Sequence, residues 1–266
     1  MTATQTTSGV GELLRAWRQR RNLSQLELSL ESAISTRHLS FVETGRAKPS
    51  REMVLHLAQR LELPLRERDG LLLAAGFAPV YGERGLEDAA MSPIREALDR
   101  FLRAHEPYPA VVVDRHWNMV CANEALAMLL GDVAPELLSA PANVLRIALH
   151  PDGMAPRIAN LAEWSGHLLQ RLRRSVAITA DVELSRLYDE LAGYPGVDPG
   201  DALHDGAAGA DIVLPLRLRR GELELTFLST ISTFGTASDV TLDELSIEAF
   251  YPADDRTASA LLDGAG

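Results

Sequence analysis

The chain has 266 residues, of which 46% are hydrophobic and 24% are charged, so it is long enough for two domains that each build a core. No run of about 18 apolar residues occurs, so no segment is predicted to span a membrane. The single cysteine, Cys121, excludes an internal disulfide and fits a reducing compartment. The first nine residues lack an apolar signal core, so we expect a cytoplasmic protein.

The distribution of charge along the chain is uneven. The net charge of −11 argues against nucleic-acid binding by the chain as a whole. Residues 1–60, however, contain nine arginine and lysine residues against five aspartate and glutamate residues, whereas residues 81–266 contain 15 against 29. A basic region joined to an acidic body is typical of a DNA-binding domain attached to a domain that does not bind DNA.

Residues 10–78 predict an all-α domain of five short helices. Ser24 opens a capping box before the second helix, and Ser35 is placed to cap a third helix that stops at Gly45. Ser50 precedes a fourth helix, and residues 65–75 supply a fifth. We expect a disordered tail at residues 1–9 and, from their proline and glycine content, a linker at residues 79–93.

Residues 94–254 predict an α+β domain, followed by a flexible tail at residues 255–266. A hairpin is expected within residues 107–123, and a glycine- and proline-rich loop at residues 193–209. The expected helices cover residues 124–130, 142–149, 156–173 and 181–192. The expected strands cover residues 212–218, 223–233 and 245–251. A hairpin, helices and then three strands is the order of a sheet with helices on one face.

The third predicted helix carries residues suited to reading DNA, because short polar side chains near a helix N-terminus reach base edges in the major groove. This helix opens with Ser35, and Thr36, Arg37 and Ser40 lie opposite its apolar side. We expect Arg37 to bind a guanine and its polar neighbours to contact other bases. Gln25, at the start of the second helix, is predicted to meet a phosphate. The predicted backbone contacts after the third helix are Arg46, Lys48 and Arg51.

The first domain resembles the Cro/C1 repressor type of helix-turn-helix, also called the XRE family, over residues 10–65. The resemblance is carried by Leu23, Ser24, Gln25, Glu27, Leu28, Ile34, Ser35, Val42, Glu43, Gly45, Pro49 and Ser50. It implies a homodimer on a double-stranded DNA operator and a structural ion pair between Arg18 and Glu43. Phe41 departs from the family, because phage-type repressors place a polar base reader there. It either touches thymine methyl groups or packs elsewhere.

Motifs along almost the whole chain resemble the regulators with an MmyB-type ligand-binding domain. These motifs are residues 35–46, 49–54, 113–118, 143–153, 156–164, 232–236 and 250–254. The resemblance implies a PAS-like fold for the second domain and a cavity for a ligand. A fatty acid, such as myristate, has been linked to members of the group. The implied partners are therefore operator DNA and a small apolar or fatty-acid effector, with no cofactor.

One predicted helix places Arg157, Asn160, Trp164 and His167 on a single stripe. A cation, an amide, an aromatic ring and an imidazole suit a carboxylate head group beside an apolar chain. On the preceding helix, four residues apart, lie the further candidates Arg146 and His150. The alternative is a structural ion-pair network, in which acidic neighbours partner the arginines and Trp164 packs in the core.

Two other classes of function remain open for the second domain. It either dimerises without a ligand or is an enzyme fused to a DNA-binding domain. We expect no enzyme, because the sequence contains no Ser/His/Asp order, phosphate-binding loop, dinucleotide fingerprint or zinc-protease motif. The histidines and acidic residues do not have a recognisable metal spacing, so no metal site is predicted. The first domain, alternatively, binds protein rather than DNA.

Overall fold

The structure is a computed structural model that describes residues 9–200 and 213–263. Contacts divide the chain into two compact units, one within residues 1–84 and 236–243 and the other within residues 85–235 and 244–266. Among the described residues, no helix is long and apolar enough to cross a membrane. Residues 1–8 of the tail predicted at residues 1–9 lie outside the described residues.

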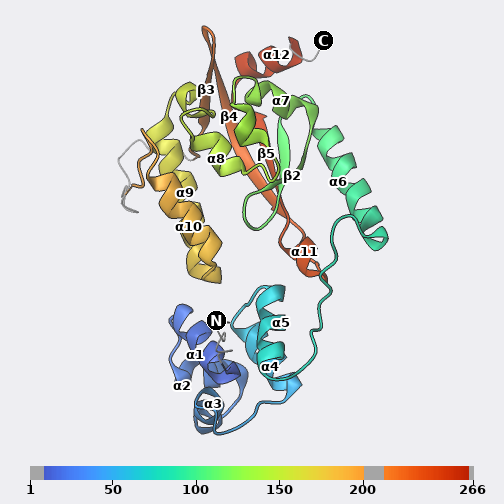
Figure 1. Ribbon diagram of the computed structural model, residues 1–266, viewed down its shortest axis with the longest axis vertical. Helices are drawn as coiled ribbons and strands as arrows, with labels where there is room; N and C mark the ends of the chain where they lie inside the picture. Colours follow the sequence, from blue (N-terminus) through green and yellow to red (C-terminus); the bar gives the residue numbers. More distant parts are fainter. Residues whose placement is uncertain (1–8, 201–212, 264–266) are drawn as a thin grey trace, which may run out of the picture. The chain divides into compact units, whose positions relative to one another are not determined.

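The first unit contains the five predicted helices (Figure 1). They are α1 (Val10–Arg20), α2 (Gln25–Ser32), α3 (Thr36–Glu43), α4 (Arg51–Arg60) and α5 (Leu65–Ala74). Ser24 and Glu27 form the capping box of α2, while the hydroxyls of Ser35 and Ser50 cap α3 and α4. Each cap satisfies backbone N–H groups that a helix N-terminus leaves free. The prediction of a helical first domain is confirmed.

A close approach of α1 to α3 organises the core of the first unit. A Cβ atom added at Gly11 would lie 2.3 Å from the carbonyl oxygen of Val42, so only glycine fits there. Leu14, Trp17 and Leu39 are buried within the surrounding cluster. This contact holds α3, the helix with the predicted base readers, against the rest of the unit.

The first unit also includes a segment from near the end of the chain. Helix α11 (Val240–Asp243) lies there, although it connects two strands of the second unit's sheet. Asp239 pairs with Arg84 at 3.2 Å, and the Asp243 carboxylate accepts the Leu65 N–H at 3.2 Å. The predicted linker at residues 79–93 is partly ordered by the first unit, because Asp69 accepts the N–H groups of residues 80 and 81.

The second unit is built on a five-stranded antiparallel sheet in the order β2-β1-β5-β4-β3. The strands are β1 (Ala110–Val113), β2 (Met119–Ala122), β3 (Leu216–Arg220), β4 (Leu223–Thr233) and β5 (Ser246–Pro252). The first two form the predicted hairpin, and the last strand in sequence pairs with the first. This arrangement confirms the predicted α+β, PAS-like fold.

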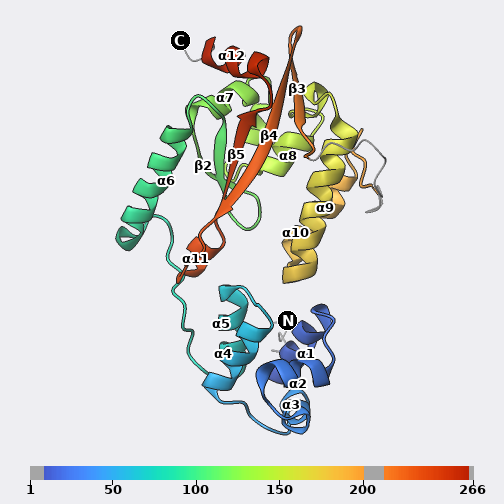
Figure 2. The same cartoon turned by 180° about the vertical axis from the view of Figure 1, so that it is seen from behind.

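In the described residues of the second unit, four helices and two 3₁₀ turns lie between β2 and β3. They are α7 (Glu124–Leu130), α8 (Val144–Leu149), α9 (Leu161–Thr179) and α10 (Val182–Ala192), with 3₁₀ turns η2 (Pro135–Leu138) and η3 (Ala155–Arg157). Helices α9 and α10 run side by side (Figures 1 and 2). Side chains from these helices and from the sheet form one continuous hydrophobic core.

Three parts of the second unit differ from the sequence predictions. Residues 255–263 form helix α12 (Asp255–Asp263) instead of a flexible tail, because Thr257 and Leu261 are buried against the sheet. Residues 92–105 form α6 (Ser92–His105), which follows the 3₁₀ turn η1 (Ala89–Met91) and was not predicted. The strand predicted from residue 212 begins at Leu216. Residue 212 and most of the predicted loop lie outside the described residues.

Candidate DNA-binding surface and ligand cavity

A buried ion pair fixes α3 relative to α1 and α2. The guanidinium of Arg18 contacts both carboxylate oxygens of Glu43, at 2.7 and 2.9 Å. The Gln25 amide donates to the same carboxylate at 2.7 Å. These hydrogen bonds outweigh burial and lower the pKa of Glu43, so the carboxylate stays ionised. The Gln25 side chain, predicted to meet a phosphate, is therefore engaged within the protein.

An aromatic ring between two arginines lies on α3 and the turn that follows it. The guanidinium of Arg37 lies 5.4 Å from the centre of the Phe41 ring, and that of Arg46 lies 6.0 Å from it. Phe41 is half-buried and does not belong to the core cluster. Cation–π attraction of this kind favours one orientation of each guanidinium. Phe41 therefore packs against the two arginines and supports them.

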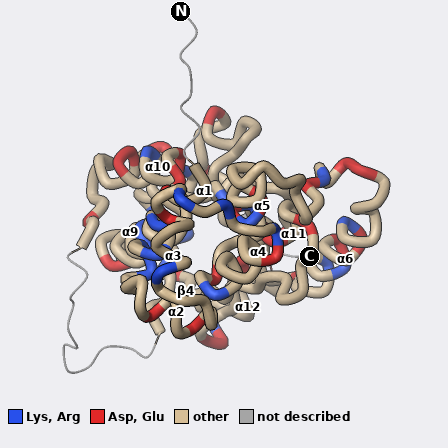
Figure 3. Tube along the Cα trace, turned by 90° about the horizontal axis from the view of Figure 1, so that it is seen from below, with Lys and Arg blue, Asp and Glu red and all other residues tan. Residues whose placement is uncertain are grey.

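The remaining predicted base readers are less exposed than the sequence indicated. The Thr36 hydroxyl shares a hydrogen bond with Ser29 at 2.9 Å, and Ser40 is half-buried. Arg37 is exposed, as are the predicted backbone contacts Arg46, Lys48 and Arg51. Figure 3 marks the basic positions along the chain trace in blue. Of the base readers predicted on α3, Arg37 has the freest side chain.

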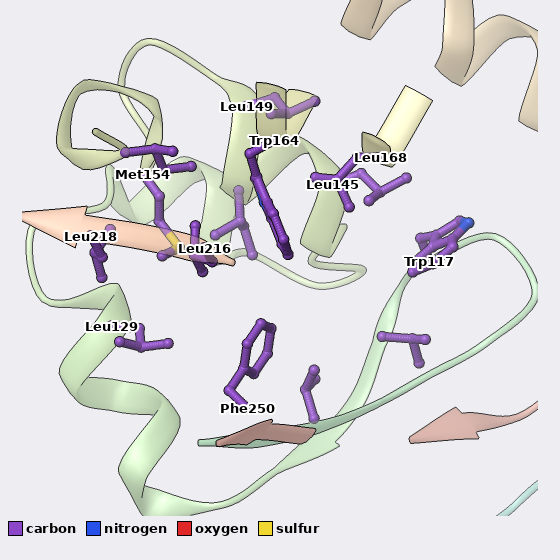
Figure 4. Close-up of a cluster of buried hydrophobic side chains, with 14 of the residues drawn as sticks. Trp117, Leu129, Leu145, Leu149, Met154, Trp164, Leu168, Leu216, Leu218 and Phe250 are labelled. Atoms are coloured by element: carbon purple, nitrogen blue, oxygen red, sulfur yellow. The ribbon is translucent and has the colours of Figure 1, made fainter. Parts of the chain in front are cut away.

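The second unit contains an apolar cavity of about 70 Å³. This volume is several times the roughly 10–15 Å³ that one buried water molecule requires. The cavity is lined by Val111, Met119, Leu126, Leu129, Leu130, Val144, Leu145, Ile147, Ala148, Met154, Ile158, Trp164, Leu168, Leu216, Glu248 and Phe250. Trp164 from α9 and Phe250 from β5 point toward one another across the cluster (Figure 4). Such a lining is typical of a site for an apolar ligand.

One acidic side chain interrupts this apolar lining. Glu248 is 6% exposed, and burial raises the pKa of its carboxyl group. Its partner is Arg171 of α9, whose Nη1 atom lies 3.4 Å from Oε1 of Glu248. The guanidinium of Arg171 also lies 4.2 Å from the centre of the Trp117 ring. Glu248 is thus the polar group of the lining, and Arg171 and Trp117, which do not line the cavity, are linked to it through these contacts.

The predicted stripe of ligand-binding residues is not a single helix face. Arg157 lies in η3, Asn160 precedes α9, and only Trp164 and His167 lie on the helix. Between η3 and α9, Ile158 is extended and bridges to Leu218 of the sheet, and residues 159 and 160 form a turn before the helix. Pairing with the sheet thus replaces the first turns of the predicted helix.

Most of the six predicted ligand-binding residues have structural partners instead. The Asn160 side chain bonds the backbone of Pro215 and Arg217, and Arg157 donates to the Leu129 carbonyl and faces Asp132 at 3.6 Å. His167 lies against the Trp164 ring at 5.7 Å, and its pKa is lowered by burial. Of the stripe, Trp164 alone lines the cavity.

The two candidates on α8 are also engaged elsewhere. Arg146 donates two hydrogen bonds to Glu190, at 2.8 and 2.7 Å. These hydrogen bonds and the negative charge of Glu190 raise the pKa of the Arg146 guanidinium. The His150 ring lies 5.0 Å from that of Tyr194. Neither lines the cavity. The pairing of Arg146 with Glu190 agrees with the alternative stated in the sequence analysis, in which acidic neighbours partner the arginines.

The sequence analysis did not predict Glu248 as a polar group of the cavity lining. Its signal is a single charge in an apolar strand: Glu248 stands between Ile247 and Ala249 in β5. A charged residue inside a strand predicted to be buried requires a partner. The sequence does not show that this partner is Arg171, because a long helix offers several arginines. Within the described residues, no group of three or more histidine, cysteine, aspartate or glutamate side chains could hold a metal ion.

Each of the two units matches a known protein family. Residues 14–68 match the helix-turn-helix family, and residues 94–262 match the family described as the MmyB-like transcription regulator ligand binding domain. No curated protein matches the chain. A solved structure of an RNA-binding light-oxygen-voltage receptor aligns with 16% identity and a TM-score of 0.30 over 99% of this chain. The chain spans 64% of that receptor's length. The chain belongs to the MmyB-like transcription regulators and carries a helix-turn-helix domain and a ligand-binding domain.

Proposed function

We propose that the chain is a cytoplasmic regulator whose affinity for an operator changes when an apolar ligand, such as a fatty acid, occupies the second unit. The observation that carries this proposal is the apolar cavity, in which Glu248 is the only charged residue among the sixteen described residues that line it. A small apolar molecule gains free energy there by leaving water, at about 25 cal/mol per Å² of apolar surface. A long acyl chain requires side chains to move, and the flexible Met119 and Met154 support such adaptation.

The DNA-binding half of the proposal rests on α3. Arg37 is the exposed base reader, and Phe41 holds its guanidinium in one orientation. Exposed cations at Arg46, Lys48 and Arg51 are placed to contact the phosphate backbone. A homodimer would present two such helices to a palindromic operator, with half-sites about one helical turn apart.

The path of the chain supports coupling between ligand and operator. Helix α11 is anchored to the first unit through Asp239 and Asp243, and it joins β4 directly to β5. Glu248 and Phe250 of β5 line the cavity. A ligand that shifts β5 would therefore change how residues 236–243 are held, provided that the ligand prefers one of two conformations.

Two experiments test this function. Selection from random DNA duplexes with the full-length protein should recover a palindromic operator whose affinity falls steeply with salt. Native mass spectrometry after gentle purification should show a bound apolar molecule. A protein that enriches no DNA sequence contradicts the operator. A clean mass with no response to added lipids would instead favour a domain that only dimerises.

A further inference from the structure

Glu248 is the feature of the cavity that hydrophobic burial does not explain. It lies in the middle of β5, opposite Val111 of β1, and shares its face of the sheet with Phe250. Glutamate is among the residues least often fully buried, because removing its charge from water is costly. Its carboxyl group therefore requires a polar partner.

The pairing of Glu248 with Arg171 is incomplete. One nitrogen of Arg171 faces one oxygen of Glu248 at 3.4 Å. The buried pair of Arg18 and Glu43, by comparison, has two contacts of 2.7 and 2.9 Å. Among the described contacts, Oε2 of Glu248 accepts no hydrogen bond. A carboxylate offers about four acceptor positions, so most of its capacity remains for a ligand.

The charge balance at this end of the cavity restricts the ligand. The Arg171 guanidinium is held over the Trp117 ring and faces a single carboxylate, so the pair is neutral when Glu248 is ionised. An ionised carboxylate on the ligand would add a second negative charge, and an ammonium group would add a second positive charge. A neutral hydrogen-bond donor changes neither charge, and a buried unpaired charge is the costlier alternative.

We propose that Glu248 accepts a hydrogen bond from the polar end of the ligand, and that this end is a neutral O–H group on a hydrocarbon. The proposal rests on the proposed function of the cavity as a ligand site. Two sources share this chemistry: an alcohol, and a carboxylic acid that binds in its un-ionised form. The acid donates the same O–H group to Glu248 that the alcohol does.

The two sources differ in proton uptake. Near neutral pH a fatty acid is ionised in solution, so binding as the un-ionised acid takes up one proton, whereas an alcohol takes up none. Glu248 itself titrates, with a pKa that burial raises. Helix α9 contributes Arg171, which has the charged neighbour Arg174 and lies near His167. The partners of Glu248 in the sheet are Val111 and Ile231. At pH values where Glu248 is ionised in the free protein, affinity for the acid should therefore fall about tenfold per pH unit above the acid's own pKa, and affinity for the alcohol should stay constant.

The test is calorimetric titration of the full-length protein with dodecanol, dodecanoic acid and methyl dodecanoate from about pH 6 to about pH 8. The methyl ester has the same hydrocarbon but no O–H group. We expect dodecanol to bind about tenfold more tightly than the ester, because a hydrogen bond to a charged group strengthens binding by that order. Dodecanoic acid should show uptake of one proton.

The Glu248→Gln variant sharpens the test, because it keeps the size of the side chain and removes its charge. Dodecanol should bind about tenfold more weakly to this variant. Dodecanoic acid should lose its pH dependence and bind more tightly at the alkaline end, because its ionised carboxylate then pairs with Arg171. A merely structural role of Glu248 would weaken all ligands equally. The matched control is Glu190→Gln, which removes a surface carboxylate paired with Arg146 and should change nothing.

The possible failures are distinguishable. If the ester binds as tightly as dodecanol and Glu248→Gln alters neither, the role of Glu248 is overturned while the cavity remains a ligand site. If none of the three compounds binds, the proposed apolar-ligand function fails, and the role of Glu248 fails with it.

Discussion

Arg37 and Phe41 lie one turn apart on α3, with the guanidinium 5.4 Å from the ring centre. Replacing Phe41 with leucine would keep an apolar side chain but remove the ring that orients Arg37. An exposed cation–π contact contributes about 0.5–1 kcal/mol, so operator affinity should fall about two- to fivefold. Fluorescence anisotropy with labelled operator would measure this change, and unaltered affinity would show that Phe41 does not support base reading.

Arg37 itself should determine base preference at one operator position. Arg37→Ala should cost about 1–3 kcal/mol and relax the preference for a single base pair. Arg60→Ala is the matched control, because Arg60 is also exposed but lies at the last turn of α4. Measuring the affinity of both variants for a panel of operators with single-base changes tests this prediction. Equal effects of the two substitutions would contradict the role assigned to Arg37.

The buried pair of Arg18 and Glu43 should stabilise the first unit only as a pair. Arg18→Met leaves the Glu43 carboxylate buried beside Gln25 without its cation, which should destabilise the unit by about 3–5 kcal/mol. The double variant with Glu43→Leu should recover most of this loss, because it leaves no buried charge. Hydrogen exchange of the α1 and α3 amides measures the effect. No recovery in the double variant would count against this explanation.

Asp181, which caps α10, predicts a specific loss of stability in acid. Burial alone would raise its pKa, but hydrogen bonds from His116 and Arg115 outweigh burial and lower the pKa to about 2, from an ordinary value of 3.8. Because the folded-state pKa is depressed, the stabilisation is complete above about pH 4 and is lost as the pH falls toward 2. The loss is about 2 kcal/mol.

Urea unfolding of the second unit between pH 2 and pH 5 would measure this dependence. Asp181→Asn should flatten it, since the amide does not titrate. Asp152→Asn serves as the control, because the Asp152 side chain is exposed. If both variants keep the full acid dependence, another carboxylate is responsible.

The sequence predicted the parts of this protein that local rules determine. Ser24, Ser35 and Ser50 each begin a helix of the first unit, because a short polar side chain caps free N–H groups wherever it precedes an apolar periodic run. The alternation and spacing of apolar residues also predicted the hairpin and the final strands of the second unit. Family motifs supplied the PAS-like fold.

The parts that the sequence did not predict depend on contacts between distant residues. The helix expected from residue 156 begins at Leu161, because Ile158 pairs with Leu218, sixty residues later in the chain. The arginines that were expected to bind a ligand head group instead pair with acidic residues, such as Arg146 with Glu190. Asp255–Asp263 is small and polar in sequence, and it is helical because the sheet buries Leu261.

Residues 236–243 should carry coupling between the ligand and the operator. Asp243→Ala removes the acceptor of the Leu65 N–H and so loosens α11 from the first unit. We expect the variant to bind the operator alone and the apolar ligand alone with unchanged affinity. The coupling free energy between the two should fall by about 0.5–2 kcal/mol. Glu222→Ala, in the exposed turn between β3 and β4, is the control. Undiminished coupling in Asp243→Ala would exclude this route.

The central claim is tested most directly by the affinity for the selected operator with and without saturating dodecanoic acid. Wild-type protein should change its operator Kd by at least about fivefold, the lower range of allosteric coupling. Leu168→Phe fills the cavity from α9, and Ala148→Leu fills it from α8, so both variants should bind the operator without responding to the acid. An unchanged operator Kd in wild-type protein, or a full response in both filled variants, would contradict the account.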